Sequence, residues 1–293
     1  MENKRIGLLY IMPWLIGLLI FTIYPFVSSL ILSFTNYNII NSPKFIGLSN
    51  YINMFHDNIF KTSLLATIEF VIITVPLKLI FSLLIAYILN FKLRGINFFR
   101  TAYYLPSILG GNVAIAVMWQ FLFAQNGLVN QFLTLFHVKP VGWFSNGLGA
   151  LFTISALRIW EFGSTMIIFL AGLKDIPQEL YEAAAVDGAG KVRTFFNVTI
   201  PLLTPIIFFN LVMQLIQAFQ EFNGPYLITN GGPLYKTYLL GMMIYDNSFK
   251  YFKMGYASAI SWFLFIIIMI FTMFVFKSSK YWVFYSDEGG GES

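Results

Sequence analysis

The sequence predicts an all-α integral membrane protein with six transmembrane helices. Three observations support this fold class. Of the 293 residues, 58% are hydrophobic and only 11% are charged, a balance typical of membrane rather than soluble proteins. Six apolar runs of roughly 20 residues or more are long enough to cross a hydrocarbon core of about 30 Å as helices. A polar, helix-prone insert separates the fourth run from the fifth.

Each apolar run predicts one span. The runs cover Ile6–Phe34, Leu64–Leu89, Thr101–Phe123, Leu148–Leu173, Pro205–Ile228 and Ala257–Phe276. The first run begins behind Lys4 and Arg5 like a secretory signal, but it is too long for a cleavable segment and no small-x-small cleavage pattern follows it. We therefore expect an uncleaved first span. The whole of residues 1–285 is expected to form a single transmembrane domain, and residues 286–293 a flexible tail that resembles a cloning remnant.

Lys and Arg are distributed unevenly between the two sides of this six-span arrangement. Outside the spans, ten lie on the side that carries both chain termini and six lie on the other side. Because cytoplasmic loops hold the excess of Lys and Arg, both termini are expected in the cytoplasm. The insert at residues 174–203, between spans four and five, then also faces the cytoplasm, which is the side that holds ATP.

The insert predicts a pair of short helices joined by a glycine turn. Asp175 and Gln178 have the spacing of a capping box, and Pro177 suits an early helical position. Gly188 or Gly190 supplies a left-handed turn, and residues 191–199 form a second helix that the proline at position 201 helps to terminate. An amphipathic connector lying on the membrane surface is the alternative.

The motifs of this insert resemble those of a known family. Glu182-Ala183-Ala184 is followed by Asp187-Gly188-Ala189 and then by Ile200-Pro201-Leu202. This order is similar to the cytoplasmic coupling loop of sugar ABC importer permeases, the binding-protein-dependent transport system inner-membrane components. Four other segments resemble the carbohydrate branch, and most of all its first-permease type: Phe45–Tyr51, Tyr103–Pro106, Thr229–Pro233 and Gly255–Ala259. The resemblance covers most of the chain and implies a type I ABC importer permease fold.

The resemblance also implies a role for the insert. In that family the loop docks into a cleft on the ATP-hydrolysing subunit and couples closure of the ATPases to movement of the permease helices. The matching positions are Glu182, Ala183, Ala184, Asp187, Gly188, Ala189, Ile200 and Pro201. Glu182 would make the main polar contact and Gly188 the bend.

The implied partners follow from the same family. They are two ATPase subunits that bind ATP and Mg, a second related permease that forms a heterodimer with this chain, and an extracytoplasmic solute-binding protein. The implied location is the bacterial cytoplasmic membrane.

Span five carries a stripe of polar side chains. Steps of four, three and four residues place its members within about 60° of one another on a helix that turns about 100° per residue. The members are Asn210, Gln214, Gln217 and Glu221. In a bilayer such groups face the bundle interior, another helix or water. Amides both donate to and accept from sugar hydroxyls, which favours a carbohydrate path. Interhelical hydrogen bonding at a dimer interface is the alternative.

Span four adds further candidates for the substrate path. Arg158 and Glu161 lie three residues apart and therefore on one helical face. Mutual neutralisation explains the two opposite charges, and a substrate contact is the alternative. Trp119 and Trp160 could stack on a sugar ring, or belong to the packing and interfacial aromatics that are abundant in this chain.

Several function classes find no support in the sequence. With no Cys and only two His, a metal centre is not expected. The formal charge of +5 is attributed to membrane loops rather than to nucleic acid binding. Gly188-Ala189-Gly190-Lys191 is followed by Val192 and does not make a Walker A loop, so ATP hydrolysis is expected on another subunit.

We therefore expect the permease subunit of an ATP-driven importer, which passes a sugar or oligosaccharide from the binding protein into the cytoplasm by alternating access. It is expected to be neither an enzyme nor the holder of a cofactor. An ion-coupled secondary transporter of a small polar solute is the alternative, because Glu69, Glu161 and Glu221 lie in the apolar runs. A membrane enzyme such as a glycosyltransferase would need an acidic cluster and a soluble domain, and the sequence offers neither.

Overall fold

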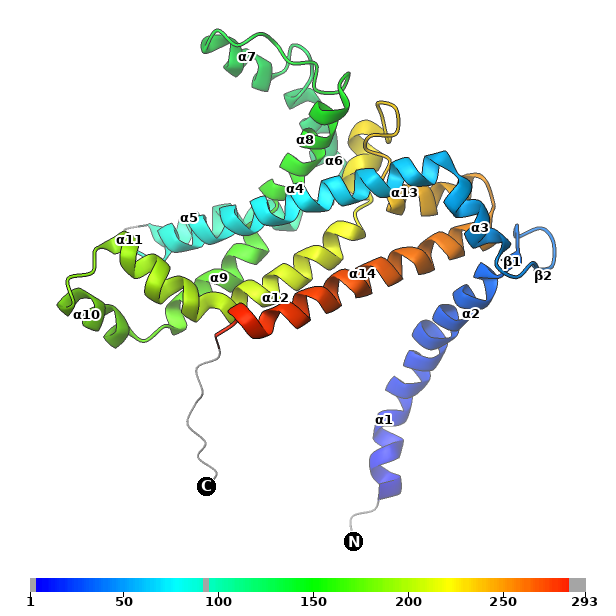
Figure 1. Ribbon diagram of the computed structural model, residues 1–293, viewed down its shortest axis with the longest axis horizontal. Helices are drawn as coiled ribbons and strands as arrows, with labels where there is room; N and C mark the ends of the chain where they lie inside the picture. Colours follow the sequence, from blue (N-terminus) through cyan, green and yellow to red (C-terminus); the bar gives the residue numbers. More distant parts are fainter. Residues whose placement is uncertain (1–3, 92–94, 285–293) are drawn as a thin grey trace. The chain divides into compact units, whose positions relative to one another are not determined.

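The computed structural model describes residues 4–91 and 95–284, and the expected tail at 286–293 lies outside them (Figure 1). The prediction of an all-α fold is confirmed, because one two-residue-per-strand ladder is the only sheet in the described part of the chain. The Cα positions form two compact units. The first holds Met1–Lys61 with Met242–Ile266, and the second holds Thr62–Gly241 with Ile267–Ser293.

The first unit contains the first span, the loop that follows it and part of the last span. Its elements are α1 (Lys4–Leu18), the π-helical turn η1 (Leu19–Ile23), α2 (Tyr24–Ser33), β1 (Thr35–Asn36), β2 (Lys44–Phe45), α3 (Ser49–His56), most of α13 (Leu240–Tyr245), the π-helical turn η4 (Asp246–Lys250) and the first half of α14 (Met254–Trp282). Helix α2 packs against α14, where the ring centroids of Phe26 and Trp262 lie 4.7 Å apart. The Trp262 indole also donates a hydrogen bond to Ser29.

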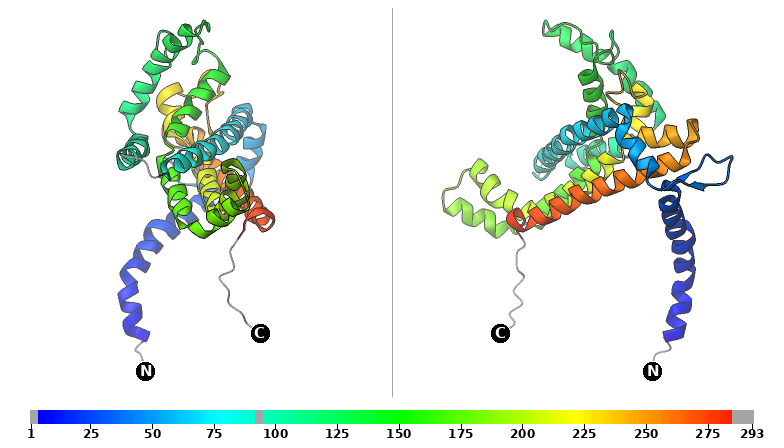
Figure 2. Two further views of the ribbon diagram at one scale, coloured as in Figure 1. Left: turned by 90° about the vertical axis from the view of Figure 1, so that its left-hand side faces the viewer. Right: turned by 45° about the vertical axis from the view of Figure 1, so that its right-hand side comes forward.

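The second unit contains most of the remaining helices (Figure 2). They are α4 (Asn58–Leu89), α5 (Ile96–Leu109), α6 (Val113–Leu122), α7 (Leu128–Leu135), α8 (Gly147–Trp160), α9 (Gly163–Asp175), α10 (Gln178–Val186), α11 (Lys191–Thr194), η2 (Phe195–Thr199), α12 (Ile200–Phe219) and η3 (Pro225–Thr229), with the second half of α14. Helix α12 and this half of α14 run side by side, because Phe208 packs on Phe276 and Phe219 on Phe271.

The membrane-spanning segments agree in number with the six expected spans when each bent pair counts as one. Four helices are long and apolar enough to cross a bilayer by themselves, and two bent helix pairs raise the number to six among the described residues. Helices α5 and α6 bend by 103° at Gly110–Asn112, and α8 and α9 bend by 45° at Glu161–Phe162. The expected third and fourth spans are therefore both broken, which apolar run lengths do not reveal.

The fifth span also differs from the expected range. It begins at Lys191 and its helix ends at Phe219, whereas the apolar run continues to Ile228. Gly224 and Pro225 interrupt the run, and the carboxylate of Glu221 accepts a hydrogen bond from the Gly224 amide at 3.1 Å. The fifth helix thus ends before a break at residues 220–222, and the short π-helical segment η3 (Pro225–Thr229) follows separately.

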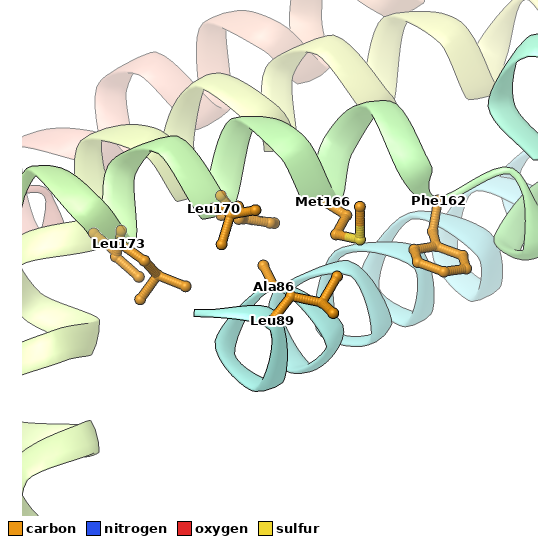
Figure 3. Close-up of a cluster of buried hydrophobic side chains, with 8 residues drawn as sticks. Ala86, Leu89, Phe162, Met166, Leu170 and Leu173 are labelled. Carbon is orange, nitrogen blue, oxygen red and sulfur yellow. The ribbon is translucent and has the colours of Figure 1, made fainter. Parts of the chain in front are cut away.

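A buried apolar cluster joins α4, α9 and α12 next to the insert (Figure 3). It consists of Ala86, Leu89, Phe162, Met166, Phe169, Leu170, Leu173 and Leu203. Gly172 brings α9 and α12 close together, because a Cβ at this position would collide with the side chain of Ile206. Both ends of the insert at residues 174–203 are consequently anchored to packed helices.

Candidate functional site

Helix α10 carries most of the predicted coupling residues on an exposed surface. None of its residues is buried, and Glu182, Ala183, Asp187 and Gly188 are all exposed. The side chain of Gln178 donates to the Glu182 carboxylate at 2.9 Å, so Glu182 is oriented by its own helix. In Figure 1, α10 and α11 lie at one end of the second unit. Helix α10 is therefore short, carries several small side chains, and leaves its polar groups accessible at the surface.

Gly188 makes the bend that the sequence predicts. Its φ of 73° is left-handed, whereas Gly190 has a φ of −71° and is extended. The Ala189 amide donates to Ala184 and the Gly188 amide to Ala185, at 2.9 and 3.1 Å. This pair of bonds is the Schellman arrangement, which satisfies carbonyl groups at the end of α10. The glycine turn therefore fixes the angle between α10 and α11.

The start of α10 differs from the predicted capping box. The residue before the helix is Pro177, in an extended conformation and without a side-chain capping bond. Asp175 instead ends α9. Since the residue before a proline is disfavoured in the helical conformation, Ile176 leaves the helix and separates Asp175 from α10.

The distal end of the insert is continuous with the fifth span. Helix α11, the π-helical turn η2 and α12 follow one another without a break, and Pro201 lies in the first turn of α12. The expectation that Pro201 helps to terminate a separate helix is wrong, because the helical segment from Lys191 to Phe219 runs through this proline. Tyr181 in α10 bonds to Thr199 at 3.2 Å, which ties α10 to this continuous helical segment. Ile200 and Pro201 are half-buried.

The polar stripe of the fifth span divides into two pairs. Asn210 and Gln214 are buried, and Gln214 donates to Thr165 of α9 at 3.1 Å. Gln217 is exposed and accepts from Arg158 at 2.9 Å. Glu221 lies beyond the end of α12, so it is not on the helical stripe, but it also contacts Arg158. Gln214 therefore connects α12 with α9, whereas Gln217 and Glu221 both contact one guanidinium.

Arg158 is the centre of an ion-pair network. Its Nη1 lies 2.7 Å from Glu161 and its Nε 3.4 Å from Glu221. The side chains of these three residues are 22%, 11% and 12% exposed, so the pairs are largely removed from water. The ion pair expected between Arg158 and Glu161 is thus present in the structure, and Glu221 extends it.

Lys78 lies near the same network, and no spacing in the sequence predicts its proximity to Arg158. It is 2% exposed in α4 and interacts electrostatically with Arg158, Glu161 and Glu221. Two cations and two anions therefore gather, and their formal charges cancel. Such cancellation is what buried charges in a membrane segment require.

Glycine residues make room for this network at the breaks of the third and fourth spans. A Cβ on Gly110 would collide with the side chain of Glu161. Ser107 donates to the Glu161 carbonyl at 3.2 Å and accepts from the Ser164 amide at 3.0 Å, so it bridges the ends of α8 and α9. A cavity of about 70 Å³ remains, whose lining includes Gly110, Gly111, Arg158, Glu161 and Glu221. The sequence signal was Gly110-Gly111-Asn112 inside an apolar run, which marks a helix break.

Trp119 and Trp160 are neighbours, with ring centroids 5.6 Å apart. Trp119 is buried and its indole donates to the Thr153 carbonyl at 2.9 Å. Trp160 is half-buried and directly precedes the break at Glu161. The pair packs α6 against α8 beside the charge network. Among the described residues, no group of three or more His, Asp or Glu side chains is placed to hold a metal ion.

The chain matches the family described as "binding-protein-dependent transport system inner membrane component" over residues 79–283. It is 47% identical to the probable ABC transporter permease protein YesP of Bacillus subtilis, over 98% of this chain and 94% of the relative. It is 31% identical to the trehalose/maltose transport system permease protein MalF of Thermococcus litoralis, over 96% and 95%.

The fold is similar to that of a solved permease. A crystal structure of a bacterial alginate ABC transporter, in complex with an alginate pentasaccharide-bound periplasmic protein, contains a chain with a TM-score of 0.81 and 22% identity, over 95% of this chain and 96% of that one. The apolar spans and the matches over nearly the full length of these relatives agree. The chain therefore belongs to the binding-protein-dependent inner-membrane permeases, the translocation subunits of ABC importers.

Proposed function

We propose that this permease passes a neutral carbohydrate from an extracytoplasmic binding protein into the cytoplasm. The observation that carries the proposal is the coupling helix α10, which presents Glu182 and the Gly188 turn on an exposed surface between two anchored stems. The Thermococcus litoralis relative supports a carbohydrate as the solute, since its name assigns it trehalose and maltose.

The orientation follows from the charges outside the spans. Ten Lys and Arg lie on the side of both termini and six on the other, which favours cytoplasmic termini and a cytoplasmic α10. On that side α10 docks on an ATPase subunit, and two such subunits hold ATP and Mg. A second, related permease completes the membrane part. Residues 1–285 then act as a single transmembrane domain, and the membrane is the bacterial cytoplasmic membrane.

The charge network supports a neutral cargo. Both buried cations, Lys78 and Arg158, are already matched by Glu161 and Glu221, so no net positive charge is left to attract an anionic solute. Amide groups suit hydroxyl-rich solutes because they donate and accept. The path is proposed to run along Asn210, Gln214, Gln217 and Glu221, beside Arg158, Glu161, Trp119 and Trp160.

Movement of α10 reaches the spans through both of its stems. One stem is α9 and the other is the continuous segment of α11, η2 and α12, and the two pack closely at Gly172. The buried apolar cluster also packs α4 against α9 and α12. Closure of the ATPases therefore shifts these helices together, and the solute cavity opens to the cytoplasm as it closes to the outside.

The proposal is tested with the complete transporter in nanodiscs. Binding protein loaded with maltose, trehalose or another member of a panel of neutral sugars should raise ATP hydrolysis and drive uptake in vesicles. Glu182→Lys should abolish the stimulation without changing membrane insertion. Glu179→Lys makes the same charge change on another exposed residue of α10 and should retain most of the stimulation of ATP hydrolysis. Equal stimulation of ATP hydrolysis in the two variants would contradict the coupling role of Glu182. Uptake that depends on an ionophore-sensitive gradient would favour the secondary transporter.

A further inference from the structure

The first unit contains a polar cavity that the coupling loop and the charge network do not use. Its volume is about 410 Å³, within the range of small-molecule sites in proteins. Three Asn, two Tyr, one Asp and one Lys line it. Every lining side chain thus carries a hydrogen-bonding group, in a chain of which 58% is hydrophobic.

Part of the cavity wall is fixed by hydrogen bonds. Asp57 accepts from the Tyr256 hydroxyl at 3.0 Å and from the Ile59 amide at 2.8 Å. Asn50 is buried, and its Nδ2 donates to the carbonyls of Ser33 and Thr35 at 2.8 and 2.9 Å. Both amide hydrogens of Asn50 are therefore committed, and what it offers to the cavity is its acceptor oxygen. The fixed wall presents acceptors in preset positions.

The rest of the wall supplies donors on exposed side chains. Asn36, Asn53 and Lys253 are exposed and line the cavity. An ammonium and amide NH₂ groups face a wall that contains one carboxylate, so the cavity holds one formal charge of each sign. A neutral solute rich in hydroxyl groups fits this mixture of donors and acceptors, whereas an anion would meet Asp57 and a cation would meet Lys253.

The cavity lies on the side where the solute arrives. It is built from the loop after the first span and from the start of α14. These segments are extracytoplasmic when both termini are cytoplasmic. We propose that this cavity is a carbohydrate-binding subsite at the outer surface, which holds the cargo between its release from the binding protein and its entry into the translocation path. This inference rests on the proposed function for the class of cargo and for the orientation.

The absence of Cys makes a direct test possible. Asn53→Cys places a thiol in the cavity, and Asn41→Cys places one on an exposed residue of the same loop that does not line it. Both are labelled with a membrane-impermeant maleimide in the complete transporter, with and without the most strongly transported sugar of the panel. The sugar should slow labelling of Asn53→Cys several-fold and leave Asn41→Cys unchanged. Mannitol, offered at the same concentration, controls for viscosity and osmotic effects.

A second pair of variants tests function. Asn53→Phe fills the cavity and should raise the KM for sugar uptake several-fold with kcat little changed, while Asn41→Phe should match the wild type. Equal labelling rates with and without sugar, together with equal KM values for the two Phe variants, would overturn the subsite. Protection of Asn53→Cys by sugar-free binding protein alone would also overturn it, because the cavity would then dock protein. If the wild-type transporter carries none of the sugars, the proposed function itself is wrong. That result comes from the wild type alone, so it is distinguishable from a failure of the subsite, which the variants test.

Discussion

Arg158 shows how one residue can hold three segments together. Its guanidinium reaches Glu161, Gln217 and Glu221, which come from the break after α8, from α12 and from the turn beyond α12. A planar fork of five N–H donors is suited to such a role, and a Lys ammonium is not. The network therefore depends on Arg158 more than on any single carboxylate.

Removing Arg158 should destabilise the protein more than removing a complete pair. Arg158→Met leaves two carboxylates with Lys78 as their only cation, and the loss in free energy of unfolding is expected to be about 3 kcal/mol. Arg158→Met combined with Glu161→Gln leaves one charge of each sign and should be less harmful than the single change. Thermal unfolding midpoints in one detergent compare the variants. If the unfolding midpoint of the double variant falls by the sum of the decreases for Arg158→Met and Glu161→Gln alone, the two charges act independently.

Gly110 and Gly111 provide a matched comparison at the same break. A Cβ on Gly110 would collide with Glu161, whereas the nearest atom to a Cβ on Gly111 is the Asn223 amide nitrogen at 4.0 Å. Gly110→Ala should therefore lower the unfolding midpoint and sugar uptake, and Gly111→Ala should change both only slightly. Equal unfolding midpoints and equal uptake for the two variants would mean that the close approach of Glu161 to Gly110 does not contribute to stability or transport.

At the scale of elements, the turn that ends α10 depends on one backbone conformation. Gly188 has a φ of 73° and Gly190 a φ of −71°, and neither would place a Cβ within 4 Å of another atom. Gly188→Ala should thus weaken the turn through its dihedral angle alone, by about 1 kcal/mol. Gly190→Ala should be nearly silent.

The expected readout is a loss of coupling rather than a loss of folding. Gly188→Ala should reduce the amount of sugar transported per ATP hydrolysed, while unfolding midpoints stay close to that of the wild type. Measuring uptake and phosphate release in the same vesicles gives this ratio. A normal ratio in Gly188→Ala would mean that the angle between α10 and α11 is set by the bound ATPase instead of by the glycine turn.

The elements also show which features the sequence could predict. Apolar run length predicted six spans, and the preference of glycine for left-handed dihedrals predicted a turn at Gly188 or Gly190, which the structure has at Gly188. The breaks at Gly110–Asn112 and Glu161–Phe162 were missed because a long apolar run has the same composition whether its helix is straight or bent. Side-chain capping at Asn112, which accepts from the Ala114 amide, was the local signal.

At the scale of the whole molecule, the candidate site combines residues that sequence patterns treat separately. The spacing of Arg158 and Glu161 predicted their ion pair, because both lie near one helical turn. Lys78 and Glu221 join it from segments far along the chain, and such tertiary contacts follow from packing rather than from periodicity. Helix α10 and the turn at Gly188 were easier to predict, since their residues are local in sequence.

The orientation of the whole chain is open to a simple labelling test. Ile40 and Val186 are 85% and 88% exposed, and the chain has no Cys of its own. Ile40→Cys should react with an impermeant maleimide in intact cells, and Val186→Cys only after the membrane is opened. These results would place the first loop outside and α10 inside. The reverse pattern would contradict the positive-inside assignment and the docking of ATPase subunits on α10.

The close approach of Gly110 to Glu161 has a consequence for how this protein can change in evolution. The space that a larger residue at position 110 would need is already filled by the Glu161 side chain. A substitution at 110 becomes tolerable once position 161 carries a shorter acid or a neutral residue, and loss of that carboxylate in turn favours loss of a cation at 78 or 158. We expect these four positions to have substituted together during divergence, as one inherited unit.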